Sequence, residues 1–247
     1  MNKQTLLACG LLLATTQVSA VIIDLRHEWL DDSKVHKDRV AISHRFDNGI
    51  GFTLEAKWRS GGDDPNKPFH DLVSDGTENT LNYQFRPVKP WFVQPGFTLE
   101  STDEKSIYKP FLMTGYEFDS GIYINARYRY EYTRESEAGK EDMKTNRGEI
   151  WLGYDFTDWK VEYNYIYKHS DQIRFDNKKW DYEQNIKALW KFNQSWAPYV
   201  EVGDISVRKT TDERQTRLRI GGNDSNLLIV FYVQIMPDDF VMQLHRF

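Results

Sequence analysis

The stretch GIYINARYRYEYTR, residues Gly121 to Arg134, sorts its side chains by parity. Its odd positions are mostly polar and place Arg127 beside Arg129. Its even positions are Ile122, Ile124, Ala126, Tyr128, Tyr130 and Tyr132. A β-strand sends successive side chains to opposite faces. The stretch therefore predicts a strand with one apolar, aromatic face and one charged face, as at a boundary between lipid and water.

The same alternation recurs along the chain, and its period of two predicts a sheet rather than helices. Tight turns such as Asp47-Asn48-Gly49 alternate with long polar links such as residues 60–76. This layout is typical of outer-membrane barrels, with periplasmic turns and external loops. We expect an all-β fold, a transmembrane antiparallel up-and-down β-barrel of about twelve strands. The strands should begin near Val21, Val35, Ile50, Thr77, Trp91, Ile107, Gly121, Thr145, Trp159, Lys179, Trp196 and Arg214.

The first twenty residues have the pattern of a secretory signal. Lys3 is followed by the apolar run from Leu6 to Ala14, which is too short to span a bilayer as a helix. Val18-Ser19-Ala20 is a small-residue cleavage signature. We expect a signal peptide at residues 1–20, a barrel domain at 21–222 and an atypical C-terminal tail at 223–247. The only cysteine, Cys9, lies in the signal, so we expect no disulfide in the barrel.

Composition favours a membrane barrel over a soluble periplasmic sugar-binding barrel, which remains an alternative. Aromatic residues make up 15% of the chain, and tyrosines and tryptophans dominate the apolar faces. These residues prefer sites where the ring is buried and the polar tip is wet, whereas a soluble core favours Val, Ile and Leu. The mean hydropathy is -0.67 and the formal net charge is -5. We therefore expect outer-membrane lipid around the barrel and no nucleic acid as a partner.

The polar faces would line the lumen, and their basic residues are the candidate site. Arginine binds carboxylates through two parallel hydrogen bonds, and several modest sites in succession allow conduction. An acidic oligosaccharide is the expected cargo. The alternative is that arginine and glutamate pair and fill the interior, as Arg147 and Glu149 could. The candidate pore-lining residues are Arg26, Arg39, Arg45, Lys57, Arg127, Arg129, Arg147, Lys168, Lys187, Arg217 and Arg219.

Trp151 shares the lumen parity, where it is either a surface for sugar stacking or a girdle residue displaced by a bulge.

Enzymatic chemistry has little support in the sequence. The six histidines show no close metal-ligand spacing, and no nucleophile-elbow, zinc-protease or phosphate-loop motif is present. Asp63, Asp64 and Asp71 could hold calcium, or they simply belong to a solvated loop. We expect no catalytic residue, metal or cofactor. The alternative function is a barrel enzyme or adhesin that acts through its external loops.

Three segments resemble the small, monomeric, oligogalacturonate-specific porins of enterobacteria, whose relatives include a sialic-acid-inducible channel. They are Trp91 to Gly96, Ser195 to Gly203 and Glu213 to Gly221. The resemblance implies a twelve-stranded monomer in the bacterial outer membrane, with lumen tracks of Arg and Lys for acidic oligosaccharides such as pectin fragments. The family motif carries over to Arg217 and Arg219.

The C-terminus departs from this family, whose members end soon after the Arg-x-Arg-x-Gly of the last strand. Here the chain continues through residues 222–226 into the apolar run from Leu227 to Met236 and ends at Phe247. Gln243 and His245 occupy positions where apolar residues are expected. We therefore interpret the C-terminus as frameshifted or replaced. If the tail is genuine, we expect a short, aberrant last strand and less secure closure of the barrel.

Overall fold

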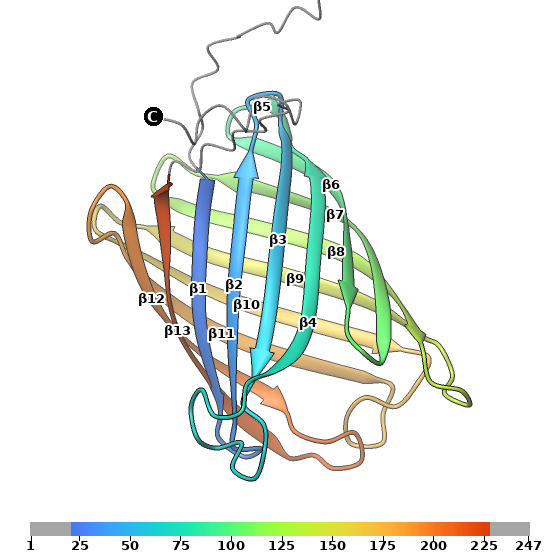
Figure 1. The fold of residues 1–247 in the computed structure, drawn as a ribbon. Coiled ribbons are helices and arrows are strands. Elements are labelled where there is room, and N and C mark those ends of the chain that lie inside the picture. Colours follow the sequence, from blue (N-terminus) through green and yellow to red (C-terminus); the bar gives the residue numbers. More distant parts are fainter. Residues whose placement is uncertain (1–20, 228–247) are drawn as a thin grey trace, which may run out of the picture.

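Antiparallel strands form a closed barrel in the computed structural model, which describes residues 21–227 (Figure 1). Each strand pairs with the next along the chain, except that β4 and β5 both pair with β6, and β1 pairs with β13. The strands are β1 (Val21–Leu30), β2 (Val35–Arg45), β3 (Ile50–Arg59), β4 (Val73–Tyr83), β5 (Phe85–Val88), β6 (Trp91–Ser101), β7 (Lys105–Glu117), β8 (Ile122–Glu135), β9 (Met143–Asp155), β10 (Trp159–Ser170), β11 (Trp180–Trp190), β12 (Trp196–Ser206) and β13 (Arg214–Leu227). The expected signal peptide lies outside the described residues.

The short strand β5 continues β4 rather than adding a wall strand. β4 pairs with β6 up to Asn82↔Gly96, and β5 resumes in the same register at Phe85↔Val93. The direct β4–β6 pairing closes the wall, so the barrel has twelve strands and the all-β barrel prediction is confirmed.

The last strand differs from the expectation. β13 runs to Leu227 and pairs with β1 from Val21↔Leu227 to Leu30↔Arg217, with one irregularity near its end. The strand is therefore not short, and hydrogen bonding to β1 closes the barrel, which contradicts the predicted weak closure. Paired strand extends into the segment 223–247 that the sequence set apart, and residues 228–247 lie outside the described part of the chain.

Within residues 21–227 four prolines lie inside strands, and three of them, Pro95, Pro110 and Pro198, lie where the ladder to one neighbour is interrupted. Pro95 pairs with β7 but not with β4 or β5, and Pro110 pairs with β6 but not with β8. Pro198 pairs with β13, whereas the β11 ladder ends at Tyr199. Because proline has no N–H to donate, such positions tolerate it without a lost ladder bond.

The parity read from the sequence matches the faces of the wall. In β8, Ile124 and Tyr128 are 42% and 55% exposed on the outside, whereas Arg129 is 5% exposed inside. Aromatic rings also pair on the outer face, as Trp159 and Trp190 do at 5.8 Å between centroids. The outer surface is thus an apolar band with aromatic residues, the pattern of a lipid-facing barrel. Within residues 21–227, no helix is long and apolar enough to cross a membrane.

Candidate functional site

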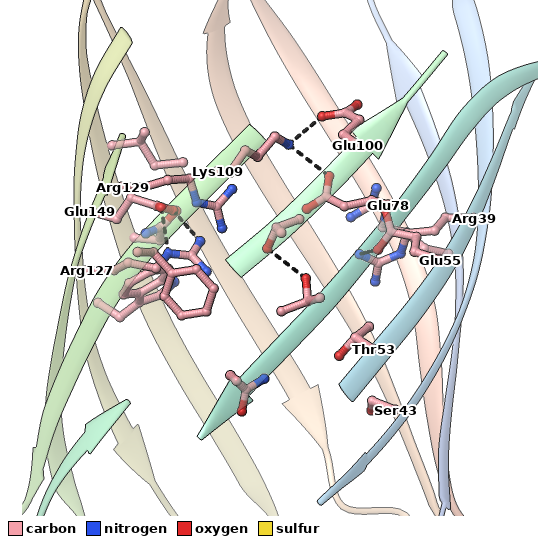
Figure 2. Close-up of a pocket in the computed structure, with 18 of the residues that line it drawn as sticks. Arg39, Ser43, Thr53, Glu55, Glu78, Glu100, Lys109, Arg127, Arg129 and Glu149 are labelled. Atoms are coloured by element: carbon pink, nitrogen blue, oxygen red, sulfur yellow. Dashed lines mark hydrogen bonds and ion pairs between the residues drawn. The ribbon is translucent and has the colours of Figure 1, made fainter. Parts of the chain in front are cut away.

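The barrel encloses a cavity of about 820 Å³ lined mainly by charged and polar side chains (Figure 2). Ten of the eleven basic residues predicted from parity line it: Arg26, Arg39, Arg45, Lys57, Arg127, Arg129, Arg147, Lys187, Arg217 and Arg219. The remaining one, Lys168, is buried in the wall beside the cavity.

Strand register places six of these cations in two rows. On one side, Arg39 lies directly opposite Arg26 on β1 and Lys57 on β3. On another side, Arg147 lies directly opposite Arg129 on β8 and Lys168 on β10. Like charges directly opposite one another on a sheet repel, so each row needs carboxylates nearby to be stable.

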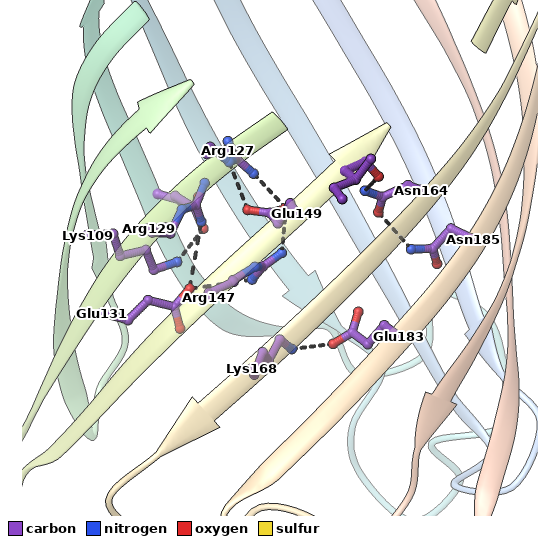
Figure 3. Close-up of polar contacts among 12 residues, drawn as sticks. Lys109, Arg127, Arg129, Glu131, Arg147, Glu149, Asn164, Lys168, Glu183 and Asn185 are labelled. Carbon is purple, nitrogen blue, oxygen red and sulfur yellow. Dashed lines mark hydrogen bonds and ion pairs between the residues drawn. The ribbon is translucent and has the colours of Figure 1, made fainter. Parts of the chain in front are cut away.

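Glu149 supplies that compensation at the β8–β9 row (Figure 3). It accepts hydrogen bonds from Arg127 Nε and Nη2 at 2.8 and 2.9 Å, and from Arg147 Nη2 at 3.1 Å. Glu131 lies 3.5 Å from Arg147 and 3.9 Å from Arg129. The Arg127 guanidinium also lies 5.1 Å from the Trp151 ring centroid and 5.6 Å from that of Phe111.

Carboxylates compensate the opposite row in the same way. Arg39 donates to Glu55 at 3.0 Å and also pairs with Asp24. Lys57 donates to Glu100 at 2.6 Å. A second lysine, Lys109 of β7, bridges Glu78 at 3.1 Å and Glu100.

The remaining wall, from β10 to β13 and β1, carries a chain of alternating charges. Lys168 pairs with Glu183, and Arg217 lies 3.4 Å from the same carboxylate. Arg219 then donates to Glu201 at 2.7 Å and to Glu28 at 2.6 Å. These contacts confirm that arginine and glutamate pair extensively, yet the cavity persists, so pairing lines the lumen without filling it.

Some cations that line the cavity form no ion pair with a carboxylate of the described residues. Arg26 has no hydrogen bond or ion pair to any residue in the range 21–227. Lys187 lies 3.9 Å from the Tyr199 ring centroid, with no ion pair to the described residues. Arg45 binds neutral oxygens, at 2.9 Å from Gly49 O and 3.0 Å from Gln94 Oε1. Such cations remain available to an anionic ligand.

Sequence reasoning missed several lumen residues. Lys109 precedes Pro110, and Tyr199 follows Pro198, so the prolines obscured the alternation on both strands. The even positions Tyr108, Leu112 and Tyr116 face outward, and this pattern would have predicted that Lys109 faces the lumen. Trp151 lines the cavity, so it faces the lumen and is not a girdle residue displaced to the outer face. Among residues 21–227 no group of three His, Cys, Asp or Glu side chains could hold a metal ion.

Comparison with known proteins identifies the family. The model of the oligogalacturonate-specific porin family (KdgM) matches residues 14–224. The chain belongs to this family. The oligogalacturonate-specific porin KdgM of Dickeya dadantii is 38% identical over 219 residues, which cover 85% of this chain and 93% of that protein. The uncharacterized protein YiiY of Salmonella typhimurium is 45% identical over 213 residues, which cover 85% and 92%.

Solved structures agree with this placement. A KdgM porin structure is 31% identical with a TM-score of 0.62, and the match covers 83% of this chain and 98% of that one. The NanC porin has a TM-score of 0.70 over 82% and 98% of the two chains, and at 17% identity it supports the fold alone. The protein is therefore an outer-membrane porin of the KdgM family and not an enzyme, and the soluble sugar-binding alternative is set aside.

Proposed function

We propose that this porin conducts acidic oligosaccharides, oligogalacturonates from pectin in particular, as a monomer. The two rows of cations around the cavity carry the proposal, because a row of guanidinium and ammonium groups offers a polyuronate successive carboxylate sites. A related KdgM porin, 32% identical, has been solved in complex with disordered oligogalacturonate, which supports this cargo class. The eleven basic residues predicted from parity are the proposed cargo contacts.

Single-channel recording in planar bilayers tests the proposal. We expect an anion-selective reversal potential in a KCl gradient. Trigalacturonate should close the channel transiently, whereas maltotriose, a neutral trisaccharide, should not. Equal closures by both sugars, or a folded barrel without conductance, would contradict it. A sialylated trisaccharide in the same assay distinguishes a preference for galacturonate from a general preference for carboxylated sugars.

A further inference from the structure

Two tyrosines of the lumen wall lie against glycines of the neighbouring strand. A Cβ atom on Gly153 of β9 would lie 2.1 Å from Tyr123 Cζ, and a Cβ atom on Gly221 of β13 would lie 2.4 Å from Tyr199 Cζ. No side chain other than hydrogen leaves room for these rings. Each ring therefore packs directly against the backbone of the neighbouring strand, and both tyrosines are buried.

Each ring is also fixed at its hydroxyl and covered by a lysine. Tyr123 Oη donates to Glu162 Oε2 at 2.6 Å, and Lys160 Nζ lies 4.3 Å from the ring centroid. Tyr199 Oη donates to Asp24 Oδ1 at 3.3 Å, and Lys187 Nζ lies 3.9 Å from its centroid. Both distances lie within the range of a cation–π contact. The same arrangement of glycine, tyrosine, carboxylate and lysine thus occurs twice.

Lys187 lies between two carboxylates that it does not bind. Glu162 of β10 and Glu201 of β12 are directly opposite it, yet neither lies within 4.0 Å of its ammonium group. Glu162 accepts the Tyr123 hydroxyl instead, and Glu201 accepts Arg219 at 2.7 Å. The Lys187 ammonium group instead lies over the Tyr199 ring.

Arg26 adds a second available cation at this position. It lies directly opposite Gly221, the residue against which Tyr199 lies, and both Arg26 and Lys187 line the cavity. An aromatic face attracts a cation without cancelling its charge, whereas a carboxylate partner neutralises it. The wall around Tyr199 therefore presents two cations whose charge is not compensated by direct contact.

We propose that Tyr199 is a positioning residue that holds the Lys187 ammonium group at the lumen surface, and that Lys187 and Arg26 form a subsite for the carboxylate of an acidic sugar. Tyr123 holds Lys160 in the same way at the second copy of the arrangement. This inference rests on the proposed function. Among the proposed cargo contacts, it distinguishes these two cations, which have no carboxylate in direct contact, from cations such as Arg127 and Arg219, which glutamates also bind.

A double-mutant cycle tests the inference, with trigalacturonate as the probe and blocked time as the readout. Lys187→Met should shorten the blocked time, and Tyr199→Leu should shorten it about two- to tenfold, the range of a cation–π contact. Tyr199→Leu should have no further effect when Lys187 is already Met. Tyr199→Phe retains the ring and should keep the wild-type blocked time. Tyr163→Leu, which removes a tyrosine 38% exposed on the outer wall, is the matched control.

The outcomes separate this inference from the proposed function. An unchanged blocked time in Tyr199→Leu, or an equal shortening with and without Lys187, would overturn the positioning role while the channel still binds its cargo. A wild-type channel that trigalacturonate does not block would overturn both. Should Tyr199→Leu fail to fold, Tyr123→Leu with Lys160→Met gives the same cycle at the second copy.

Discussion

Glu149 shows how single residues control both stability and selectivity in the lumen. It is 3% exposed and accepts hydrogen bonds from Arg127 and Arg147. In Glu149→Gln the two guanidinium groups lose their shared anion. We expect the free energy of unfolding to fall by about 1–3 kcal/mol, the cost of leaving charged donors poorly paired. The reversal potential in a KCl gradient should shift toward greater anion selectivity, because the lumen gains a positive charge.

Urea unfolding and bilayer recordings measure the two effects of Glu149→Gln. Glu117→Gln is the matched control, since its carboxylate is exposed and pairs with Arg86 at 3.4 Å, a contact of small expected value. A Glu149→Gln channel with unchanged stability and unchanged selectivity would show that the network around Glu149 contributes neither.

Gly96 keeps the cavity open by accommodating Phe111. A Cβ atom on Gly96 would lie 2.3 Å from Phe111 Cζ, so Gly96→Ala must displace the ring, and the free space lies in the lumen. We expect lower single-channel conductance and a loss of about 1–3 kcal/mol from overpacking.

Gly148→Ala is the control for Gly96→Ala, because its Cβ would have no atom within 4 Å. It should leave conductance unchanged and, through reduced freedom of the unfolded chain, raise stability by about 0.4–1 kcal/mol. Equal conductance in Gly96→Ala and the wild type would contradict the role given to Gly96.

At the scale of elements, the long external loop between β3 and β4 is held against the outer wall by two histidines. His27 Nδ1 lies 2.8 Å from Asp38 Oδ1, and His27 Nε2 lies 3.0 Å from His36 Nδ1. His36 Nε2 lies 2.9 Å from the Asn66 carbonyl oxygen of the loop. These contacts, together with the Phe69 ring 5.1 Å from the His27 ring, tie the loop to β1 and β2.

The histidine contacts predict how the loop responds when His36 is removed. Without the contact from His36 to Asn66, the loop should open more often, so chymotrypsin should cleave after the exposed Phe69 faster in His36→Ala than in the wild type. The exposed His169→Ala, on another strand, should leave this rate unchanged. Equal cleavage after Phe69 in His36→Ala and the wild type would contradict the role given to His36.

The elements and their faces were largely predictable, because alternation reports which side of a strand meets lipid. Prediction was weakest where prolines interrupt the ladder, and for this reason Lys109 and Tyr199 were missed. Partners were not predictable either: parity places Arg127 and Lys187 on one face but does not reveal that Glu149 binds the first and a tyrosine ring holds the second. Those contacts depend on the register between neighbouring strands and on side-chain conformation, which alternation along one strand does not reveal. The comparison with family members that end soon after the last strand also led to a wrong prediction for β13, which is neither short nor weakly paired with β1.

At the scale of the whole molecule, total charge and lumen charge have different consequences. The chain has a formal net charge of -5, yet cations outnumber carboxylates among the side chains that line the cavity. Low-dielectric walls concentrate the field of charges inside a channel, whereas charges on exposed loops are screened by solvent. An anion-selective channel in an acidic protein is therefore physically consistent.

The salt dependence of ion selectivity tests whether lumen charges, rather than loop charges, set the selectivity of the channel. The Debye length falls from about 10 Å at 0.1 M salt to about 3 Å at 1 M, so cations that act across the lumen lose reach while those in contact with an ion do not. We expect the chloride-to-potassium permeability ratio to be largest in dilute KCl and to fall at 1 M. Arg26→Gln should lower the ratio in dilute KCl, because Arg26 has no compensating ion pair among the described residues. Arg208→Gln, which alters an exposed loop pair with Glu213, should leave it unchanged. If Arg208→Gln lowers the ratio as much as Arg26→Gln, the external loops rather than the lumen set selectivity.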